Sequence, residues 1–417
     1  MSKQFIISLT FLFAVAVNGQ TASSSPYSFY GIGDLVFKGT VENRSMGGIN
    51  MLKDSIHINV QNAAGLSDLL YTTYTVGGNI NQTSLKTSTD NETAKRVSLD
   101  YFIIGIPVSK KFGTAIGIMP FTSLGYQIRN FSEDNTQPSY RYTGTGGINR
   151  VYGAVGYKIN KSFSVGVDMN YNFGVISTNN ISFLNDIQYG TREINNSTIS
   201  GANVNFSLLF NRKINKKLTV FGSLLYAPEG TLQLENERRI ATVQFSEAFG
   251  EAVIEEDIIP VEDKNIKLPS RFTLGMGIGQ EQKWSIGAEL SLIQASRFDN
   301  RFNDIDGVTF ENSTKINIGG YFLPNYKSFT SYFARVNYRA GFFYQNTGMV
   351  INNEQINNFG ITFGLGLPMK GTFSNLNLGY EYGTRGTTNA GLIQENYSNI
   401  TISLSLNDKW FLKRKID

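Results

Sequence analysis

The chain contains a single histidine, His57, so any histidine-dependent chemistry must be built around it. Asp54 and Ser55 lie just before it, and the chain has no cysteine. A hydrolytic triad requires a serine, a histidine and an orienting acid in one geometry, whereas a packed or solvated histidine needs no such partners. One histidine and no cysteine leave only carboxylates as metal ligands. We therefore expect no catalytic residue, no metal and no cofactor, and predict that the protein is not an enzyme.

Charged residues that lie among small or polar side chains, in segments of alternating polarity, are more informative. These residues are Asp168, Glu289, Arg335, Arg339 and Glu381. An arginine on the lipid face of a membrane strand costs about 2–4 kcal/mol, so we expect all of them to point inward. There they either pair with each other and with an internal segment, or line a path for a solute. The first role is favoured, because an internal segment needs polar anchors.

Alternation of period two dominates the chain and predicts strands. Between Ser162 and Gly174, for example, Val165, Val167 and Met169 share one face while polar residues and glycine occupy the other. Many such segments exceed the usual soluble strand of about 5 or 6 residues and suit a tilted membrane strand of about 9–11. The 42 Gly, 30 Phe and 21 Tyr suit a barrel with aromatic girdles. A net charge of +4 is too small to suggest nucleic acid as a partner.

Short turns alternate with longer polar stretches along the chain. The short turns are Lys110–Lys111, Asn160–Lys161, Asn215–Lys217, Glu281–Lys283, Tyr326–Lys327 and Lys370–Gly371. The longer stretches are 83–93, 130–146, 178–197, 236–269, 298–311, 346–354 and 387–391. Short periplasmic turns and long outer loops are typical of outer-membrane barrels. We therefore predict an all-β fold, a closed 14-stranded antiparallel transmembrane β-barrel with strands at 71–82, 94–109, 112–129, 147–159, 162–177, 198–214, 217–235, 270–280, 283–297, 312–325, 328–345, 355–368, 372–386 and 392–408.

The N-terminal part divides into two segments before the barrel at 71–417. Lys3 followed by the apolar run 5–17 is typical of a cleaved signal peptide, which we place at 1–19. Residues 20–70 lack the strand alternation and are too many for a simple tail. Because the lumen of such a barrel is too wide for wall side chains to fill, we expect this segment to form a lumenal plug, or hatch. Its candidate residues are Asp54, His57, Asn62, Ala63 and Gly65.

Pro120 interrupts an otherwise regular strand, between Met119 and Phe121. Proline donates no ladder hydrogen bond and is tolerated mainly at edges or bulges, and a closed barrel has no edge. The sequence predicts either a lateral opening in the wall at this point or a simple bulge near the rim.

The longest polar stretch, 236–269, combines many carboxylates with apolar residues. Phe245, Phe249, Ile254 and Ile258 are the candidates for a ligand groove in this outer loop. An amphipathic loop of this kind could carry a short helix, or be a solvated loop with a small packing cluster.

Several motifs together resemble the FadL-type outer-membrane transport proteins, including the branch that contains PorV-like secretion components. The motifs are Ser25–Ser28, Gly31–Leu35, Met46–Gly48, Asp54–Ser55, Asn62–Leu66, Glu381–Gly383, Glu395–Tyr397 and Leu406–Lys415. Ala63 stands where the family usually has proline. The resemblance implies a barrel with an N-terminal hatch and a kinked third strand that opens the wall laterally. It also implies that hydrophobic ligands are held by outer loops, here 178–197 and 236–269.

Two functions follow as expectations. The first is passive uptake of a hydrophobic, fatty-acid-like molecule through hatch rearrangement and a lateral opening, with ligand or detergent in the lumen. The second is a non-transporting accessory subunit of a larger outer-membrane secretion or assembly complex. In both cases the chain would lie in the cell outer membrane, in contact with its lipid. A continuous apolar path from the outer loops to Pro120 would favour transport, and an exposed apolar patch on loops would favour a partner.

Overall fold

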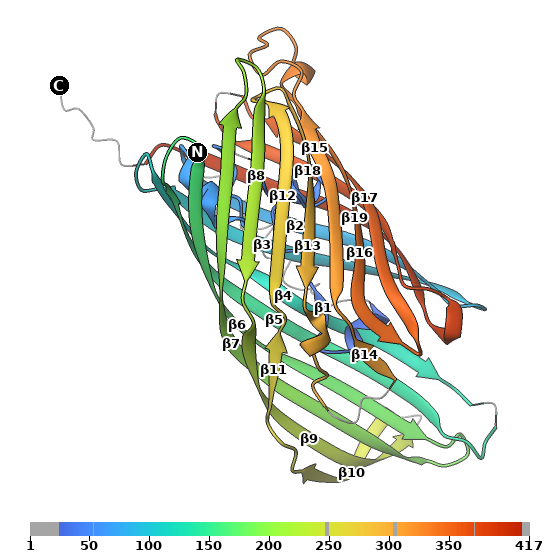
Figure 1. The fold of residues 1–417 in the computed structure, drawn as a ribbon. Coiled ribbons are helices and arrows are strands. Elements are labelled where there is room, and N and C mark those ends of the chain that lie inside the picture. Colours follow the sequence, from blue (N-terminus) through green and yellow to red (C-terminus); the bar gives the residue numbers. More distant parts are fainter. Residues whose placement is uncertain are drawn as a thin grey trace, which may run out of the picture.

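The computed structural model describes residues 25–52, 54–132, 134–246, 250–302, 307–370 and 372–410. The expected signal peptide at 1–19 lies outside these residues. The described chain confirms the prediction of a closed antiparallel barrel with fourteen wall positions (Figure 1). The last strand pairs with the first along its whole length, from Gln394 opposite Lys86 to Asp408 opposite Thr72. Closure satisfies the backbone groups of both terminal strands, which lipid could not do.

Three wall positions are built from more than one strand. One consists of β8 and β9, the next of β10, β11 and β12, and another of β14 and β15. The strands are β2 (Thr72–Lys86), β3 (Asn91–Pro107), β4 (Phe112–Asn130), β5 (Ser139–Lys158), β6 (Phe163–Phe183), β7 (Tyr189–Lys213), β8 (Thr219–Ala227), β9 (Gly230–Ser246), β10 (Gly250–Ile259), β11 (Lys264–Leu268), β12 (Arg271–Gln280), β13 (Trp284–Ile293), β14 (Val308–Phe310), β15 (Ser313–Phe322), β16 (Asn337–Ile351), β17 (Glu354–Pro368), β18 (Asn375–Arg385) and β19 (Gln394–Asp408).

Alternation along each strand separates an exposed apolar face from a buried one. On β6, Met169 and Tyr171 are exposed, whereas Asp168, Asn170 and Asn172 are buried. The exposed aliphatic and aromatic side chains form a belt suited to lipid. Among the described residues, no helix is long and apolar enough to cross a membrane.

The strands reach further than the sequence indicated at the end opposite the short turns. Much of 130–146, 178–197 and 236–269, expected to be loops, belongs to β5, β6, β7, β9, β10 and β11. These segments mix many polar and charged residues with their apolar ones and therefore look like loops by composition, but they pair with neighbouring strands in the ladder. Elsewhere the expected strand 328–345 starts only at Asn337, so the expected short turn at Tyr326–Lys327 is part of a longer connection, 323–336.

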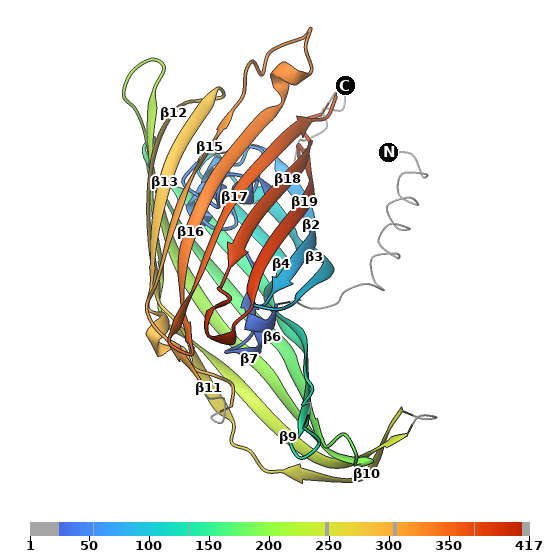
Figure 2. The same ribbon diagram turned by 90° about the vertical axis from the view of Figure 1, so that its right-hand side faces the viewer.

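Residues 25–70, called the plug from here on, lie inside the barrel (Figure 2). The plug contains η1 (Pro26–Phe29), β1 (Asp34–Leu35), α2 (Val41–Arg44) and η2 (Ala63–Asp68). Its turn after α2 lies directly on inward-facing glycines of four neighbouring strands, which we call the plug seat: Gly319, Gly341, Gly364 and Gly379. A side chain at Gly341 would meet the backbone of Met46 and Gly47. The many glycines therefore let the plug approach the wall at backbone distance.

Candidate functional site

The ladder between β3 and β4 ends partway up the wall. β3 pairs with β4 only from Phe102 opposite Ile118 to Pro107 opposite Gly113. Further up, β3 remains paired with β2 alone, while β4 continues alongside β5. We call the space between the unpaired edges of β3 and β4 the wall gap.

Pro120 lies two residues beyond the last β3–β4 pair, and its missing N–H explains why the ladder does not continue through it. On the other edge of β4, the register with β5 shifts between Pro120 and Thr122, so Phe121 is a bulge. The Phe121 ring stacks on the guanidinium of Arg150 at 3.9 Å, and Met119 is buried. The structure thus places all three sequence-predicted residues at the lower end of the wall gap.

Strand β1 of the plug fills part of this gap. Asp34 pairs with Ser123 and Leu35 with Thr122, and the N–H of Val36 donates to the carbonyl of Phe121 at 2.9 Å. The edge of β4 therefore obtains from the plug the hydrogen bonds that its missing neighbour would supply. In a bilayer each unsatisfied backbone group would cost several kcal/mol. The composition of the plug gave no indication of this strand, because two residues are too few to show alternation.

Two side-chain contacts strengthen the closure. Arg96 on β3 donates from Nη1 to Ser123 Oγ on β4 at 3.0 Å, directly across the wall gap. Arg385 on β18 forms an ion pair with Asp34 of β1 at 2.8 Å. Leu35, next to Asp34, is 66% exposed.

The inner wall beside the gap is apolar, which differs from the uniformly polar lumen face that the sequence suggested. We call this region the inner apolar surface; its buried residues are Leu124, Tyr126, Ile148, Ile176, Ile199, Leu232, Leu234, Ile266 and Leu268. It begins on β4 at Leu124, one residue after Ser123, and crosses to β11. Ile32 and Phe29 of the plug, together with Phe298, pack on it. Alternation alone places Ile148 and Ile176 inward, and this was the signal that could have revealed the surface.

The inward-facing charges hold the plug. Asp168 forms an ion pair with Lys38 at 2.8 Å, and Glu381 with Arg44 at 3.4 Å. Glu289 accepts hydrogen bonds from the backbone N–H of Asn50 at 2.5 Å and of Met51 at 3.1 Å, and from the Asn50 side chain at 2.9 Å. Arg339 is also buried and donates to Asn377 Oδ1 at 3.0 Å.

Arg335 differs from the expectation. It belongs to η4 (Phe333–Arg335), just before β16, so strand alternation does not orient it. Its guanidinium lies over the Tyr332 ring at 5.4 Å, and the neighbouring Val336 is buried. The sequence pattern placed Arg335 in a strand because a 3₁₀ turn can carry the same residue types as a strand.

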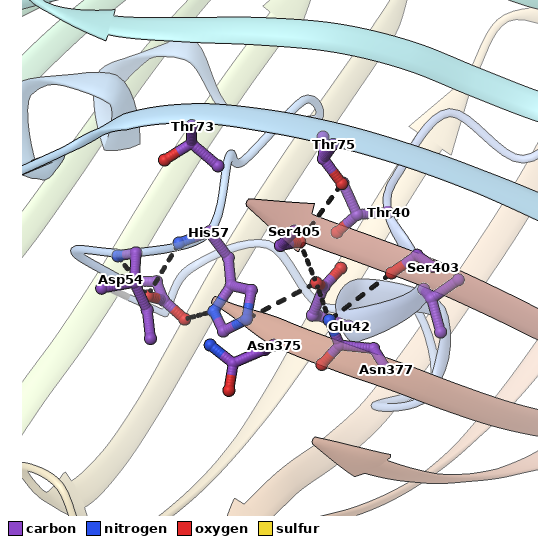
Figure 3. Close-up of polar contacts among 12 residues, drawn as sticks. Thr40, Glu42, Asp54, His57, Thr73, Thr75, Asn375, Asn377, Ser403 and Ser405 are labelled. Atoms are coloured by element: carbon purple, nitrogen blue, oxygen red, sulfur yellow. Dashed lines mark hydrogen bonds and ion pairs between the residues drawn. The ribbon is translucent and has the colours of Figure 1, made fainter. Parts of the chain in front are cut away.

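His57 is part of a polar cluster between the plug and the wall (Figure 3). Its Nδ1 lies 2.8 Å from Asp54 Oδ2, and its Nε2 lies 3.6 Å from Glu42 Oε1. Glu42 Oε1 in turn accepts from Asn377 Nδ2 at 2.7 Å and from Ser405 Oγ at 3.3 Å. Burial lowers the pKa of His57, but the two carboxylates outweigh it, so the pKa lies above its ordinary value. Both ring nitrogens thus face carboxylates, and the histidine bridges two parts of the plug.

The residues of η2 fit closely against the wall. Asn62 caps the element by accepting from the N–H of Ala64 at 3.2 Å, and Asn62 and Ala63 are fully buried. The carbonyl of Ala63 lies where a side chain on Gly156 of β5 would stand, and Gly65 packs near Asn59. Close packing at this position therefore depends on small residues in both plug and wall.

The expected outer-loop groove is not formed by its described members. Phe245 on β9 packs against Phe183 with ring centroids 5.2 Å apart. Ile254 and Ile258 lie on β10 and are exposed. Phe249 lies outside the described residues. The segment forms a hairpin of β9 and β10 in place of the expected loop or helix, since its residues pair across the turn.

Comparisons with known proteins agree with this architecture. A family model described as BamG matches residues 1–417. A Pseudomonas aeruginosa FadL homologue shares the fold with a TM-score of 0.58 at 10% identity, over 89% of this chain and 98% of that one. The Pseudomonas putida toluene transporter TodX gives 0.60 at 14% identity, over 90% and 98%. No curated protein sequence matches the chain significantly. At these identities the structural likeness concerns the fold.

Proposed function

The chain belongs to the BamG family, and we propose that it is an outer-membrane channel through which a hydrophobic small molecule, such as a fatty acid, passes laterally into the bilayer. The observation that carries this proposal is the wall gap at Pro120, with the inner apolar surface beginning beside it. An apolar solute that follows this surface and leaves through the gap avoids the aqueous periplasm. The FadL homologue and the toluene transporter TodX, which share the fold, are consistent with such a role.

In the state described here the route is closed in two places. Ile32 and Phe29 cover the inner apolar surface, and β1 occupies the edge of β4. Both belong to the first part of the plug, so one movement of residues 25–36 would clear both. Where water from the lumen replaces them, the backbone hydrogen bonds of β1 contribute only about 1 kcal/mol each net. The route therefore requires water at the edge of β4 once β1 has left, and a ligand that replaces Ile32 on the apolar surface offsets the remaining cost. The Asp34–Arg385 ion pair must also break, together with the hydrogen bonds that Gly31 forms with Asn300 and Arg301.

Cysteine pairs can test whether β1 has to leave. Leu35 and Thr122 are direct partners across the β1–β4 ladder, at a Cα separation that a disulfide tolerates, and the chain has no other cysteine. Oxidised Leu35→Cys/Thr122→Cys should block uptake of a labelled fatty acid into vesicles, and reduction should restore it. The matched control is Thr75→Cys/Ser405→Cys, which joins two paired strands of the closed wall.

Uptake that persists in the oxidised Leu35–Thr122 protein, with the disulfide verified, would show that solute does not pass the gap. Loss of uptake in the control pair as well would point to a general effect of oxidation. The Leu35–Thr122 disulfide also tests the second candidate function. An accessory subunit should still assemble into its complex when this disulfide holds β1 against β4.

That second candidate is a non-transporting subunit of a larger outer-membrane complex. It is favoured by the connection 323–336, which exposes aromatic rings at the short-turn end of the barrel. Phe329 is fully exposed and Phe333 is 74% exposed. Phe329→Ser with Phe333→Ser should then release a co-purifying outer-membrane protein while leaving the isolated barrel folded. Retention of the same complex by the double variant would remove the argument for this surface.

A further inference from the structure

Strand β10 is an edge strand at the outer end of the barrel wall, separate from the edges of the wall gap. One side of β10 pairs with β9, from Gly250 opposite Ser246 to Ile259 opposite Arg238. Among the described residues, no strand pairs with its other side. The hairpin of β9 and β10 projects from the outer end of the barrel, away from the short turns (Figure 2). The free backbone N–H and C=O groups along this side are therefore available to another extended chain.

Neither face of β10 is covered. Every residue from Ala252 to Ile259 is exposed, including Val253 at 47%, Ile254 at 57% and Ile258 at 65%. Edge strands are usually protected by charged residues, proline, a β-bulge or a covering element. β10 has a bulge at Ile254 and four carboxylates, but it contains neither lysine nor proline, and no element of the described chain covers it. Branched aliphatic residues on an open edge are the features that β-strand addition uses, with main-chain bonds for affinity and side chains for selectivity.

The carboxylates of β10 divide into two sets. Glu251 is paired with Arg141 at 2.8 Å and with Arg192 at 3.2 Å, and Glu256 lies 3.6 Å from Arg192. These ion pairs link β10 to Arg141 of β5 and Arg192 of β7, so Glu251 and Glu256 already have basic partners within the fold.

Glu255 and Asp257 form the second set, on the other face of the strand. Their neighbours on β9 are the uncharged Thr242 and Ile240, and neither carboxylate has an ion pair among the described residues. Two positions apart on a strand, they lie about 7 Å from each other on one face. A basic side chain at every second position of an added strand would lie opposite both.

We propose that β10 is a docking strand, to which an extended segment of a partner protein adds through backbone pairing, with two basic residues opposite Glu255 and Asp257. A second copy of β10 does not fit this edge, because like charges directly opposite each other destabilise a strand pair. The proposal does not depend on solute passage through the wall gap, which lies between β3 and β4 and shares no residue with β10.

A synthetic peptide provides the test. The probe is a fluorescent ten-residue peptide of alternating lysine and valine, titrated against the full chain in detergent by fluorescence anisotropy. It should bind, and binding should weaken with salt because the carboxylates are exposed. A peptide of alternating glutamate and valine, or the lysine peptide with N-methyl groups along its pairing edge, should bind at least tenfold more weakly.

The charge-reversed protein Glu255→Lys/Asp257→Lys should bind the lysine peptide about tenfold more weakly, since two attractive cross-strand pairs become repulsive. The matched control, Asp90→Lys/Glu92→Lys, makes the same change in charge where the turn after β2 enters β3, and should bind normally. Hydrogen exchange should show new protection of the β10 amides in the wild-type complex, which also reports whether the charge-reversed hairpin remains folded. Equal binding by the charge-reversed protein, equal binding of the acidic or N-methylated peptide, or protection confined to other strands would overturn the proposal.

Discussion

A single methyl group at Gly341 should displace the plug from its seat. The Cβ of Gly341→Ala would lie 2.2 Å from Gly47 N and 2.3 Å from Met46 C, both backbone atoms of the plug. Ordinary contact begins near 3.4 Å, so the turn would have to retreat by about 1.2 Å, the difference between 3.4 and 2.2 Å. A densely packed interior does not absorb a shift of that size without loss of contacts.

The expected cost follows from what the turn gives up. The N–H of Gly47 donates to Thr362 Oγ1 at 2.9 Å, and losing that bond costs about 1 kcal/mol. Crowding of a packed interior adds roughly 1–3 kcal/mol. A total of about 3 kcal/mol changes the ratio of displaced to bound plug roughly a hundredfold. The wall itself should not suffer, because alanine is more favourable than glycine within a strand.

Thiol labelling can measure the displaced fraction. Ser45 is 1% exposed beneath the turn, and the chain has no native cysteine, so Ser45→Cys reports only on release of the plug. In this background, Gly341→Ala should raise the labelling rate about a hundredfold. Gly153→Ala is the control, because its new Cβ has nothing within 4 Å. An unchanged rate in Gly341→Ala, with an intact barrel, would refute the idea that the seat holds the plug.

Three further predictions concern the plug and the gap. The pKa of His57 is raised in the folded protein, so the charged histidine stabilises the plug fully below about pH 6.5, and this stabilisation is lost as the pH rises through the pKa of the folded state. Proteolysis of the plug should therefore accelerate with rising pH. His57→Gln should remove that pH dependence. Pro120→Ala restores an N–H to β4 and should let the ladder extend, which lowers ligand uptake without destabilising the barrel; unchanged uptake in vesicles would reduce Pro120 to a simple bulge. Glu289→Ala leaves the backbone N–H groups of Asn50 and Met51 without their acceptor and should destabilise the plug by about 2–3 kcal/mol. The plug should then be proteolysed faster than in the wild type. An unchanged rate of proteolysis would contradict an anchoring role for Glu289.

The number of wall positions could be predicted because strand alternation is local. Apolar residues at every second position, as in Val165, Val167 and Met169, specify both the strand and its lipid face. Short turns between such segments then require neighbouring strands to be antiparallel. Strand ends were predicted less well, since segments such as 178–197 look like loops by composition and become strands only through their pairing partners.

Part of the candidate site could be predicted from the sequence and part could not. Pro120 could be recognised because proline donates no hydrogen bond to the ladder of a closed barrel. The partner that resolves it was not, since Asp34 and Leu35 meet Ser123 and Thr122 across almost ninety residues of chain. Likewise the carboxylate of Glu289 could be assigned to the lumen from its strand face, but not to the backbone of Asn50.

The sequence by itself determined the strands, their two faces and the inward direction of most buried charges, because these depend on periodicity and on the cost of exposing charge to lipid. Only the tertiary structure decided where the plug packs, which glycines form its seat, how β1 completes the edge of β4 and why β10 remains open. Those contacts join residues far apart in the chain, and their geometry is set by closure of the barrel and not by any local pattern.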